Sequence, residues 1–186
     1  MFIYILITTN HVNKKVILYV AVSLDGFIAR KNGSVDWLDK FNSPEEDYGY
    51  KEFLDSVNTV IMGNATYKQT LTFGEFPYKN KNCFVFAKTA KDDEYVKFVN
   101  DDVNRFINKL SSAENQRIWL VGGENLVNQF LQYDLIDEFI ISIIPVLLGE
   151  GIQLFNGNNG ELSLVVKDSK SYNSGVIQIH YERKRA

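Results

Sequence analysis

The sequence predicts one α/β domain, built on a mostly parallel central mixed sheet that is flanked by helices and followed by a C-terminal antiparallel hairpin. Three observations predict this fold class. Five short apolar runs are continuous rather than alternating, which is typical of strands covered on both faces. Helical patterns lie between these runs and indicate crossover helices. The chain has 186 residues, about the length of one domain at roughly 150 residues each.

The predicted strands are rich in Val, Ile and aromatic residues and are too short for buried helices. In chain order they span Val16–Val22, Thr59–Met62, Cys83–Ala87, Ile118–Val121 and Phe139–Ile144. Three helices are predicted between them, because apolar residues recur there at helical spacing. Their apolar stripes are Tyr50, Phe53, Leu54 and Val57, then Val103, Phe106, Ile107 and Leu110, then Leu126, Val127, Phe130 and Leu131.

The first of these helices has a strong predicted start. Ser43 is placed to be the N-cap, Pro44 to be the first helical residue and Glu46 the third, which together make a capping box. The apolar stripe of this helix extends backward through Asp47. We therefore expect the Asp47 carboxylate to face inward at the mouth of the helix.

The end of the chain changes to a period of two, which predicts strands with one solvated face. The apolar members are Leu162, Leu164 and Val166 in the first strand and Ile177, Ile179 and Tyr181 in the second. Turn residues lie between them at Asn173-Ser174-Gly175. We expect an antiparallel hairpin with His180 on its solvated face.

Composition excludes several classes of function. Twenty basic and 23 acidic residues give a net charge of −3, and the absence of a basic stripe argues against nucleic acid or an anionic membrane as a partner. Cys83 is the single cysteine and lies in an apolar run, which predicts a buried structural thiol. His11 and His180 have no ligand-like spacing, so no metal site is expected.

Residues 1–14 are expected to be an N-terminal extension of uncertain role, and residues 15–186 the folded domain. The run Phe2–Ile7 is apolar but has only six residues and no basic residue before it. A secretory signal needs an apolar run of about 7–15 residues behind a positive segment, and a membrane span needs about 20. We therefore expect a cytoplasmic protein.

Two glycine turns are candidates for anion binding. Gly122 and Gly123 follow a predicted strand and precede a helix, where backbone N–H groups and the helix dipole attract phosphate. Gly-Gly also makes ordinary tight turns, the full GxGxxG pattern is absent, and Glu124 would repel a phosphate. Gly63 and Thr66 form a second strand–turn–helix junction. Both turns lie at carboxyl ends of strands, where open α/β sheets bind ligands, so they could share one dinucleotide.

These segments carry a resemblance. Val-Ile-Met-Gly-x-x-Thr-Tyr ending at Tyr67 and Val-Gly-Gly-x-x-Leu-Val-x-Gln-Phe ending at Phe130 are similar to the dihydrofolate reductase fold family. Ser23-Leu-Asp-Gly-Phe-Ile-Ala29 and Pro145-Val-Leu-Leu-Gly-Glu-Gly-Ile-Gln-Leu-Phe155 resemble the branch typified by the C-terminal reductase domain of the bacterial bifunctional riboflavin-biosynthesis deaminase/reductase. Each motif is loose, but four occur in the right order over roughly residues 15–184.

The resemblance implies an NADPH-dependent reductase with an eight-stranded, mostly parallel sheet, and a homodimer. Carried over by position, Val20, Ala21 and Ile28 would flank the nicotinamide. The phosphates would meet Gly63, Asn64, Thr66, Gly122, Gly123, Glu124, Asn125 and Leu126. Lys88 and Thr89 would lie near the adenosine 2′-phosphate. The family usually has arginine where this chain has Asn64; Lys88 could supply the missing charge or be an ordinary solvated lysine.

The proton donor and the substrate wall are predicted from fewer signals. Hydride transfer to a C=N or C=O bond needs a proton at the other end, and Asp47 is the candidate catalytic acid. In dihydrofolate reductases proper an acid lies the same distance before the Met-Gly turn, but Asp47 could instead favour the helix dipole. Asp25, beside Gly26, is expected to form a turn. Trp37 could line the substrate pocket or fill the core.

The leading hypothesis is an NADPH-dependent oxidoreductase, similar to 5-amino-6-(5-phosphoribosylamino)uracil reductase, that passes hydride to a small heterocycle or ribosylated pyrimidine. Two alternatives remain open. One is a dihydrofolate or pterin reductase, although the segment Gly149–Phe155 favours the riboflavin-type branch. The other is a non-catalytic nucleotide-binding protein on the same fold.

Overall fold

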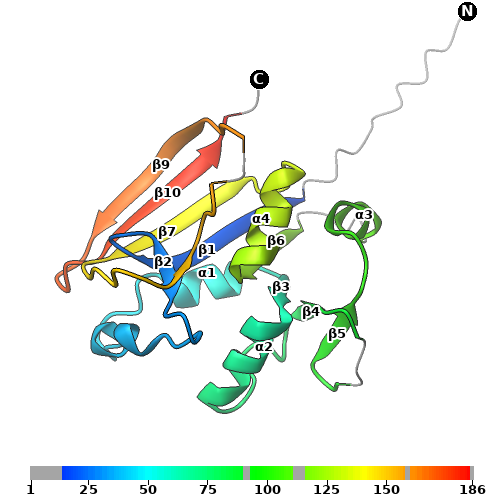
Figure 1. Cartoon of the computed structure of the whole chain (residues 1–186), viewed down its shortest axis with the longest axis horizontal. Coiled ribbons are helices and arrows are strands. Elements are labelled where there is room, and N and C mark those ends of the chain that lie inside the picture. Colours follow the sequence, from blue (N-terminus) through cyan, green and yellow to red (C-terminus); the bar gives the residue numbers. More distant parts are fainter. Residues whose placement is uncertain (1–13, 90–92, 111–115, 158–159, 185–186) are drawn as a thin grey trace, which may run out of the picture.

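The computed structural model describes residues 14–89, 93–110, 116–157 and 160–184, and these form a sheet with helices on both faces (Figure 1). The sheet has eight strands in the order β5-β4-β3-β6-β1-β7-β10-β9. Their bounds are β1 Lys15–Ser23, β3 Thr59–Gly63, β4 Asn82–Phe86, β5 Val96–Val99, β6 Arg117–Gly122, β7 Glu138–Ile144, β9 Leu164–Ser171 and β10 Ile177–Arg183. The pairs from β5 to β7 are parallel, and β10 and β9 pair antiparallel. The predicted fold class is confirmed.

Successive residues of the central strands enter two different cores, which explains why these strands are continuously apolar. On β1, Leu18 packs with α3 (Val103–Lys109) and α4 (Glu124–Gln132). Its neighbour Ile17 packs with α1 (Tyr50–Ser56) and α2 (Asn64–Thr70). The sheet is therefore the middle of three layers.

β1 separates from β6 at its carboxyl end. The two strands pair only as far as Leu18 and Leu120, whereas β1 continues beside β7 until Ser23 meets Ile144. The order of the strands also reverses here, because the chain runs outward from β1 through β3, β4 and β5 and returns with β6. Such a switch point is where open α/β sheets place their ligands.

A second, two-stranded sheet lies over this end of the molecule. It pairs β2 (Phe27–Ala29) with β8 (Ile152–Gln153) antiparallel, and neither strand is apparent from the sequence pattern. Gly151 allows the approach of these segments, because a Cβ at this position would lie 2.3 Å from the carbonyl oxygen of Ala29. Two short 3-10 helices, η1 (Asp36–Phe41) and η2 (Leu71–Phe73), complete the elements.

The predicted start of the first helix is wrong. Ser43 and Glu46 form a tight turn, and α1 begins only at Tyr50. Tyr48 and Gly49 have φ values of 56° and 76°, so the chain passes through left-handed conformations that a right-handed helix cannot include. Asp47 therefore precedes α1 and is not part of its apolar stripe.

The C-terminal antiparallel hairpin is confirmed, but the expected buried apolar face is wrong at Leu164, Val166 and Ile177, which are 38 to 57% exposed. His180 is not freely solvated. Its side chain is 29% exposed, and its Nε2 lies 3.2 Å from the buried carboxylate of Glu138 on β7. Lys15 of β1 donates to the same carboxylate at 2.6 Å. β9 at the edge of the sheet is exposed along its whole length.

Most of the predicted N-terminal extension, residues 1–13, lies outside the described residues. Among the described residues, no helix is long and apolar enough to cross a membrane.

Candidate functional site

A large cleft lies at the carboxyl ends of β1, β3 and β6, where the strands separate. Its volume is about 1250 Å³. Within the described residues, its charged lining side chains are Lys68 on α2 and Glu124 at the start of α4. The cleft is therefore large, mostly uncharged and open between two helix N-termini.

The two glycine turns are adjacent in this cleft. A Cβ on Gly63 would lie 3.7 Å from the Gly123 nitrogen, and a Cβ on Gly123 would lie 3.4 Å from Thr66 Oγ1. The peptide bond between Gly122 and Gly123 is cis. Since glycine leaves the backbone uncovered at both turns, a ligand can approach main-chain atoms of two strands at once.

Hydrogen bonds hold the Glu124 side chain in place at the start of α4. Its Oε1 accepts hydrogen bonds from the side-chain amides of Asn128 and Asn156, each at 2.9 Å. The two amide donors partly offset the negative charge that would oppose a phosphate. The N–H groups of Leu126 and Val127 both donate to the Gly123 carbonyl.

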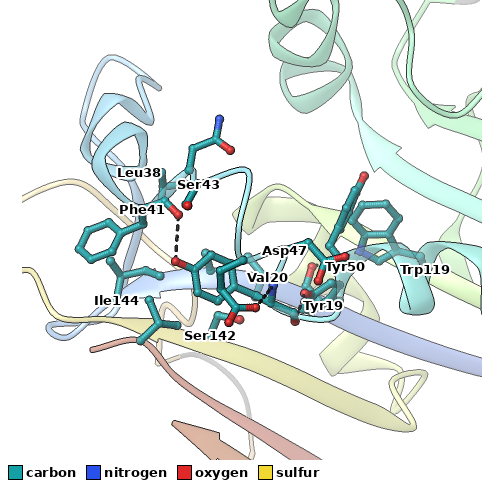
Figure 2. A pocket seen from close by; sticks show the side chains of 15 residues that line it. Tyr19, Val20, Leu38, Phe41, Ser43, Asp47, Tyr50, Trp119, Ser142 and Ile144 are labelled. Atoms are coloured by element: carbon teal, nitrogen blue, oxygen red, sulfur yellow. Dashed lines mark hydrogen bonds between the residues drawn. The ribbon is translucent and has the colours of Figure 1, made fainter. Parts of the chain in front are cut away.

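A smaller pocket of about 420 Å³ adjoins the cleft. Five residues line both cavities: Tyr19, Val20, Ala21, Leu38 and Tyr50. Figure 2 shows the Tyr50 and Trp119 rings on one side of the pocket and Phe41 with Ile144 on the other. The pocket is large enough to admit a small heterocycle and meets the cleft along β1.

Aromatic side chains hold the wall between the two cavities rigid. The Tyr19 ring packs edge-on to Phe53 at a centroid distance of 4.4 Å, and Tyr50 lies edge-on to Trp119 at 5.9 Å. Trp119 Nε1 donates to the Tyr19 carbonyl at 3.1 Å. Burial raises the pKa of the Tyr19 phenol to about 12, so this hydroxyl stays protonated at neutral pH.

Gln178 of β10 organises the polar end of the pocket. Its Nε2 lies 3.0 Å from Ser142 Oγ, 3.1 Å from the Tyr48 carbonyl and 3.4 Å from the Tyr19 hydroxyl. One amide thus ties β7, β1 and the segment before α1 together, and the Tyr19 hydroxyl itself donates to the same Tyr48 carbonyl at 3.3 Å.

The Asp47 carboxylate lies at the edge of the smaller pocket (Figure 2). It is exposed rather than inward-facing, and it accepts hydrogen bonds from the N–H groups of Gly49 at 2.9 Å and Lys51 at 3.2 Å. Asp47 therefore caps the start of α1 while its carboxylate still borders the pocket. Its assignment as the acid stays a prediction.

The structure brings most of the predicted cofactor residues together. The cleft is lined by Val20, Ala21, Ile28, Gly63, Asn64, Thr66, Gly122, Gly123, Glu124, Asn125 and Leu126. Thr66 does not cap α2, whose N-cap is Gly63 without a side-chain bond. Asp25 forms the expected turn and also accepts the N–H groups of Leu148 and Gly149, which ties the β1–β2 turn to the segment before β8.

Three predicted residues lie apart from the two cavities. Lys88 and Thr89 follow β4 and are not among the described lining residues of the cleft. Trp37 of η1 is buried with Ile144 and Val176 instead of lining the smaller pocket. The core-filling alternative for Trp37 therefore matches its position.

Sequence reasoning missed the residues that separate the cavities. Tyr19 was part of an apolar strand and Tyr50 part of a helical stripe, so neither was distinguished from the core. The hydroxyl groups of these two tyrosines could have distinguished them, because a tyrosine within a buried apolar run needs a hydrogen-bond partner for its hydroxyl. Lys68 was also missed, since an exposed lysine on a short helix has no distinguishing pattern.

Comparisons with known proteins show the family and agree with the fold. The model of the RibD C-terminal domain family matches residues 14–178. Uncharacterized protein YwjB of Bacillus subtilis (strain 168) is 44% identical over 91% of this chain and 98% of its own length. A dihydrofolate reductase of Ureaplasma parvum serovar 3 (strain ATCC 700970) is 29% identical over 66% of this chain and 70% of its own length. The crystal structure of a putative riboflavin biosynthesis protein from Shewanella sp. PV-4 has a TM-score of 0.83 and 33% identity, covering 92% of this chain and 99% of that one.

Proposed function

The chain belongs to the RibD C-terminal domain family, and on that premise we propose that it is an NADPH-dependent reductase that passes hydride to a small heterocyclic substrate. The family relates it to riboflavin-type pyrimidine reductases. The observation that carries the proposal is the meeting of the two cavities along Val20 and Ala21 of β1. A dinucleotide in the cleft and a heterocycle in the pocket would be in contact at this strand.

The residues of the cleft suit a dinucleotide. The uncovered backbone at Gly63 and Gly123, with Thr66 Oγ1 between them, offers polar groups to a pyrophosphate. Lys68 offers the cation on this wall, where Asn64 leaves none. When bound, NADPH supplies the hydride. The strand β1 would hold the ring that carries it, because Val20 and Ala21 line both cavities.

The chain itself has to deliver the proton. Asp47 borders the pocket, and backbone N–H groups fix its position. Burial raises the pKa of Tyr19 to about 12, so its hydroxyl stays protonated at neutral pH, and it already donates to the Tyr48 carbonyl. Tyr19 is therefore not the proton donor. We assign the proton relay to Asp47: its exposed carboxylate would take a proton from solvent and pass it to the ring, directly or through one water.

Cofactor binding is the first test. We expect NADPH to bind with micromolar affinity and more tightly than NADH, measured by quenching of Trp119, which lines the smaller pocket beside Tyr19 and Tyr50. Gly123→Val should abolish binding, because its side chain would enter the space beside Thr66 Oγ1. Gly160→Ala, where a Cβ meets nothing within 4 Å, is the matched control. A folded Gly123→Val protein with undiminished affinity would contradict the cleft assignment.

Turnover is the second test. Asp47→Asn should lower kcat far more than it changes NADPH affinity, because Asp47 borders the pocket rather than the cleft. An unchanged rate would remove Asp47 from the reaction. Tight NADPH binding without oxidation by any pyrimidine or pterin would favour a non-catalytic nucleotide-binding protein.

Dihydrofolate reduction is the second candidate activity. The similarity to the Ureaplasma parvum dihydrofolate reductase favours it, although that similarity covers only two thirds of this chain. Dihydrofolate-dependent oxidation of NADPH, compared with oxidation by a ribosylated aminopyrimidine, separates the two activities.

A further inference from the structure

The smaller pocket has a negative charge balance. Glu46 and Asp47 border it, and among the described residues that line it no lysine, arginine or histidine accompanies them. Lys40 precedes the pocket residue Phe41 in the sequence. Its Nζ lies over the Phe41 ring, 5.1 Å from the ring centroid. Within the described lining, an anion in this pocket would therefore meet two carboxylates and no cationic side chain, with Lys40 over the Phe41 ring.

Both carboxylates are held in position by the backbone. Asp47 accepts from the N–H groups of Gly49 and Lys51, and Glu46 Oε1 accepts from Tyr48 N at 3.0 Å. Because the two oxygens of a carboxylate can together accept about four hydrogen bonds, each group retains capacity for a donor on a ligand. The negative edge is therefore fixed and still able to accept.

The remaining wall favours a flat ring. Tyr19, Tyr50 and Trp119 pack against one another at centroid distances of 5.9 to 6.4 Å, and Phe41 lies on the opposite side (Figure 2). Aromatic faces attract flat rings and cations rather than anions. Ring N–H and amino groups would be directed to the carboxylates at the edge.

We infer that the substrate is an amino-substituted heteroaromatic ring that carries no phosphate group. The inference rests on the proposed function, and it separates this chain from reductases of phosphoribosylated pyrimidines, which the sequence resemblance suggested. A phosphate ester is held by cationic side chains or by backbone N–H groups at helix N-termini, whereas both charged side chains described in this pocket lining are acidic. Where such a ring is made as a phosphate ester, hydrolysis of that ester would have to precede the reduction.

The test compares matched compounds that differ only in the phosphate. One pair is 5-amino-6-ribosylaminouracil and its 5′-phosphate; a second is a dihydropterin with a hydroxyalkyl side chain and its phosphate monoester. Binding is measured calorimetrically with the full chain, with and without saturating NADPH, and kcat/KM is measured where turnover occurs. We expect the unphosphorylated member of at least one pair to bind tenfold or more tightly than its phosphate.

The cause of the discrimination is tested by removing charge. The double substitution Glu46→Gln and Asp47→Asn should reduce the tenfold preference to about threefold or less, and raised salt should reduce it in the wild type. Glu45→Gln is the matched control, because Glu45 lies in the same turn but outside the pocket lining. It should leave the preference unchanged.

The outcomes distinguish this inference from the proposed function. Equal or tighter binding of the phosphates, or a preference that survives the double substitution, overturns the inference even when NADPH is bound and oxidised. Binding of neither pair also overturns it, because the pocket then does not accept amino-substituted rings. Preferred binding of the unphosphorylated rings without any NADPH binding refutes the proposed function and leaves the inference supported.

Discussion

Replacing Gly151 by alanine tests how the small sheet shapes the cleft. A Cβ at Gly151 would lie 2.3 Å from the Ala29 carbonyl oxygen and 3.2 Å from Phe27 Cδ1. Both neighbours belong to β2, which carries the cleft residue Ile28. The substitution therefore pushes β2 away from β8, and with it one wall of the cofactor cleft.

The size of the effect follows from the shortfall in distance. Carbon and oxygen atoms of this kind approach to about 3.3 Å, so the backbones must separate by about 1 Å. Overpacking of this kind costs about 1–3 kcal/mol. In a chain of this length each kcal/mol lowers Tm by about 2–4 °C, so we expect Tm to fall by several degrees.

Two assays check this reasoning. Thermal unfolding should show the lower Tm, and titration should show weaker NADPH binding, because Ile28 is displaced. Gly160→Ala is the control for the loss of a glycine, since its Cβ has open space. If Gly151→Ala matched Gly160→Ala in both Tm and NADPH affinity, the close approach of β2 and β8 would not be needed for the cleft.

Three further predictions concern single side chains. Glu138→Gln should lower the free energy of unfolding by about 1.5–3 kcal/mol at neutral pH, since Lys15 and His180 lose their buried anion while Lys15 keeps Glu182 as a partner. Burial alone would raise the pKa of Glu138, but the hydrogen bond and the charge of Lys15 lower it below its usual value. The difference in free energy of unfolding between the wild type and Glu138→Gln should therefore shrink as pH falls below about 4.5. Acid titrations of both proteins measure this. Burial raises the pKa of the Cys83 thiol to about 12, so thiol reagents should label it only after unfolding; rapid labelling of the native protein would contradict this. Lys68→Ala should reduce the preference for NADPH over NADH more than Lys88→Ala does, because Lys68 lines the cleft. If titrations showed the opposite order, Lys88 would be the residue near the adenosine 2′-phosphate, as the resemblance implies.

The sequence pattern was sufficient where burial alone determines structure. The apolar run Val16–Val22 lies within β1, and the stripe at Leu126 and Phe130 lies on α4. The glycine turns were also predictable, because a strand, a glycine and a helix in succession place backbone N–H groups at the sheet edge. Those local signals located one end of the cleft correctly.

Features that depend on distant pairing were not predictable. β2 and β8 have three and two residues, and they become strands only because Phe27 meets Gln153 across more than a hundred residues. β5 was missed because Lys97 interrupts its apolar run. The predicted start of α1 was wrong because the backbone is left-handed at Tyr48. Tyrosine rarely adopts this conformation, so the sequence does not indicate it.

The partial pairing of β1 has a consequence for amide hydrogen exchange. Ile17 and Leu18 lie in register with strands on both sides, whereas Val20 and Ala21 have a registered neighbour only in β7. Local opening costs more free energy where both edges are bonded, so exchange along this one strand should accelerate toward its carboxyl end. Val20 and Ala21, which would touch both ligands, thus lie where β1 passes from a segment paired on both sides to a segment paired on one side, and this second segment opens more readily.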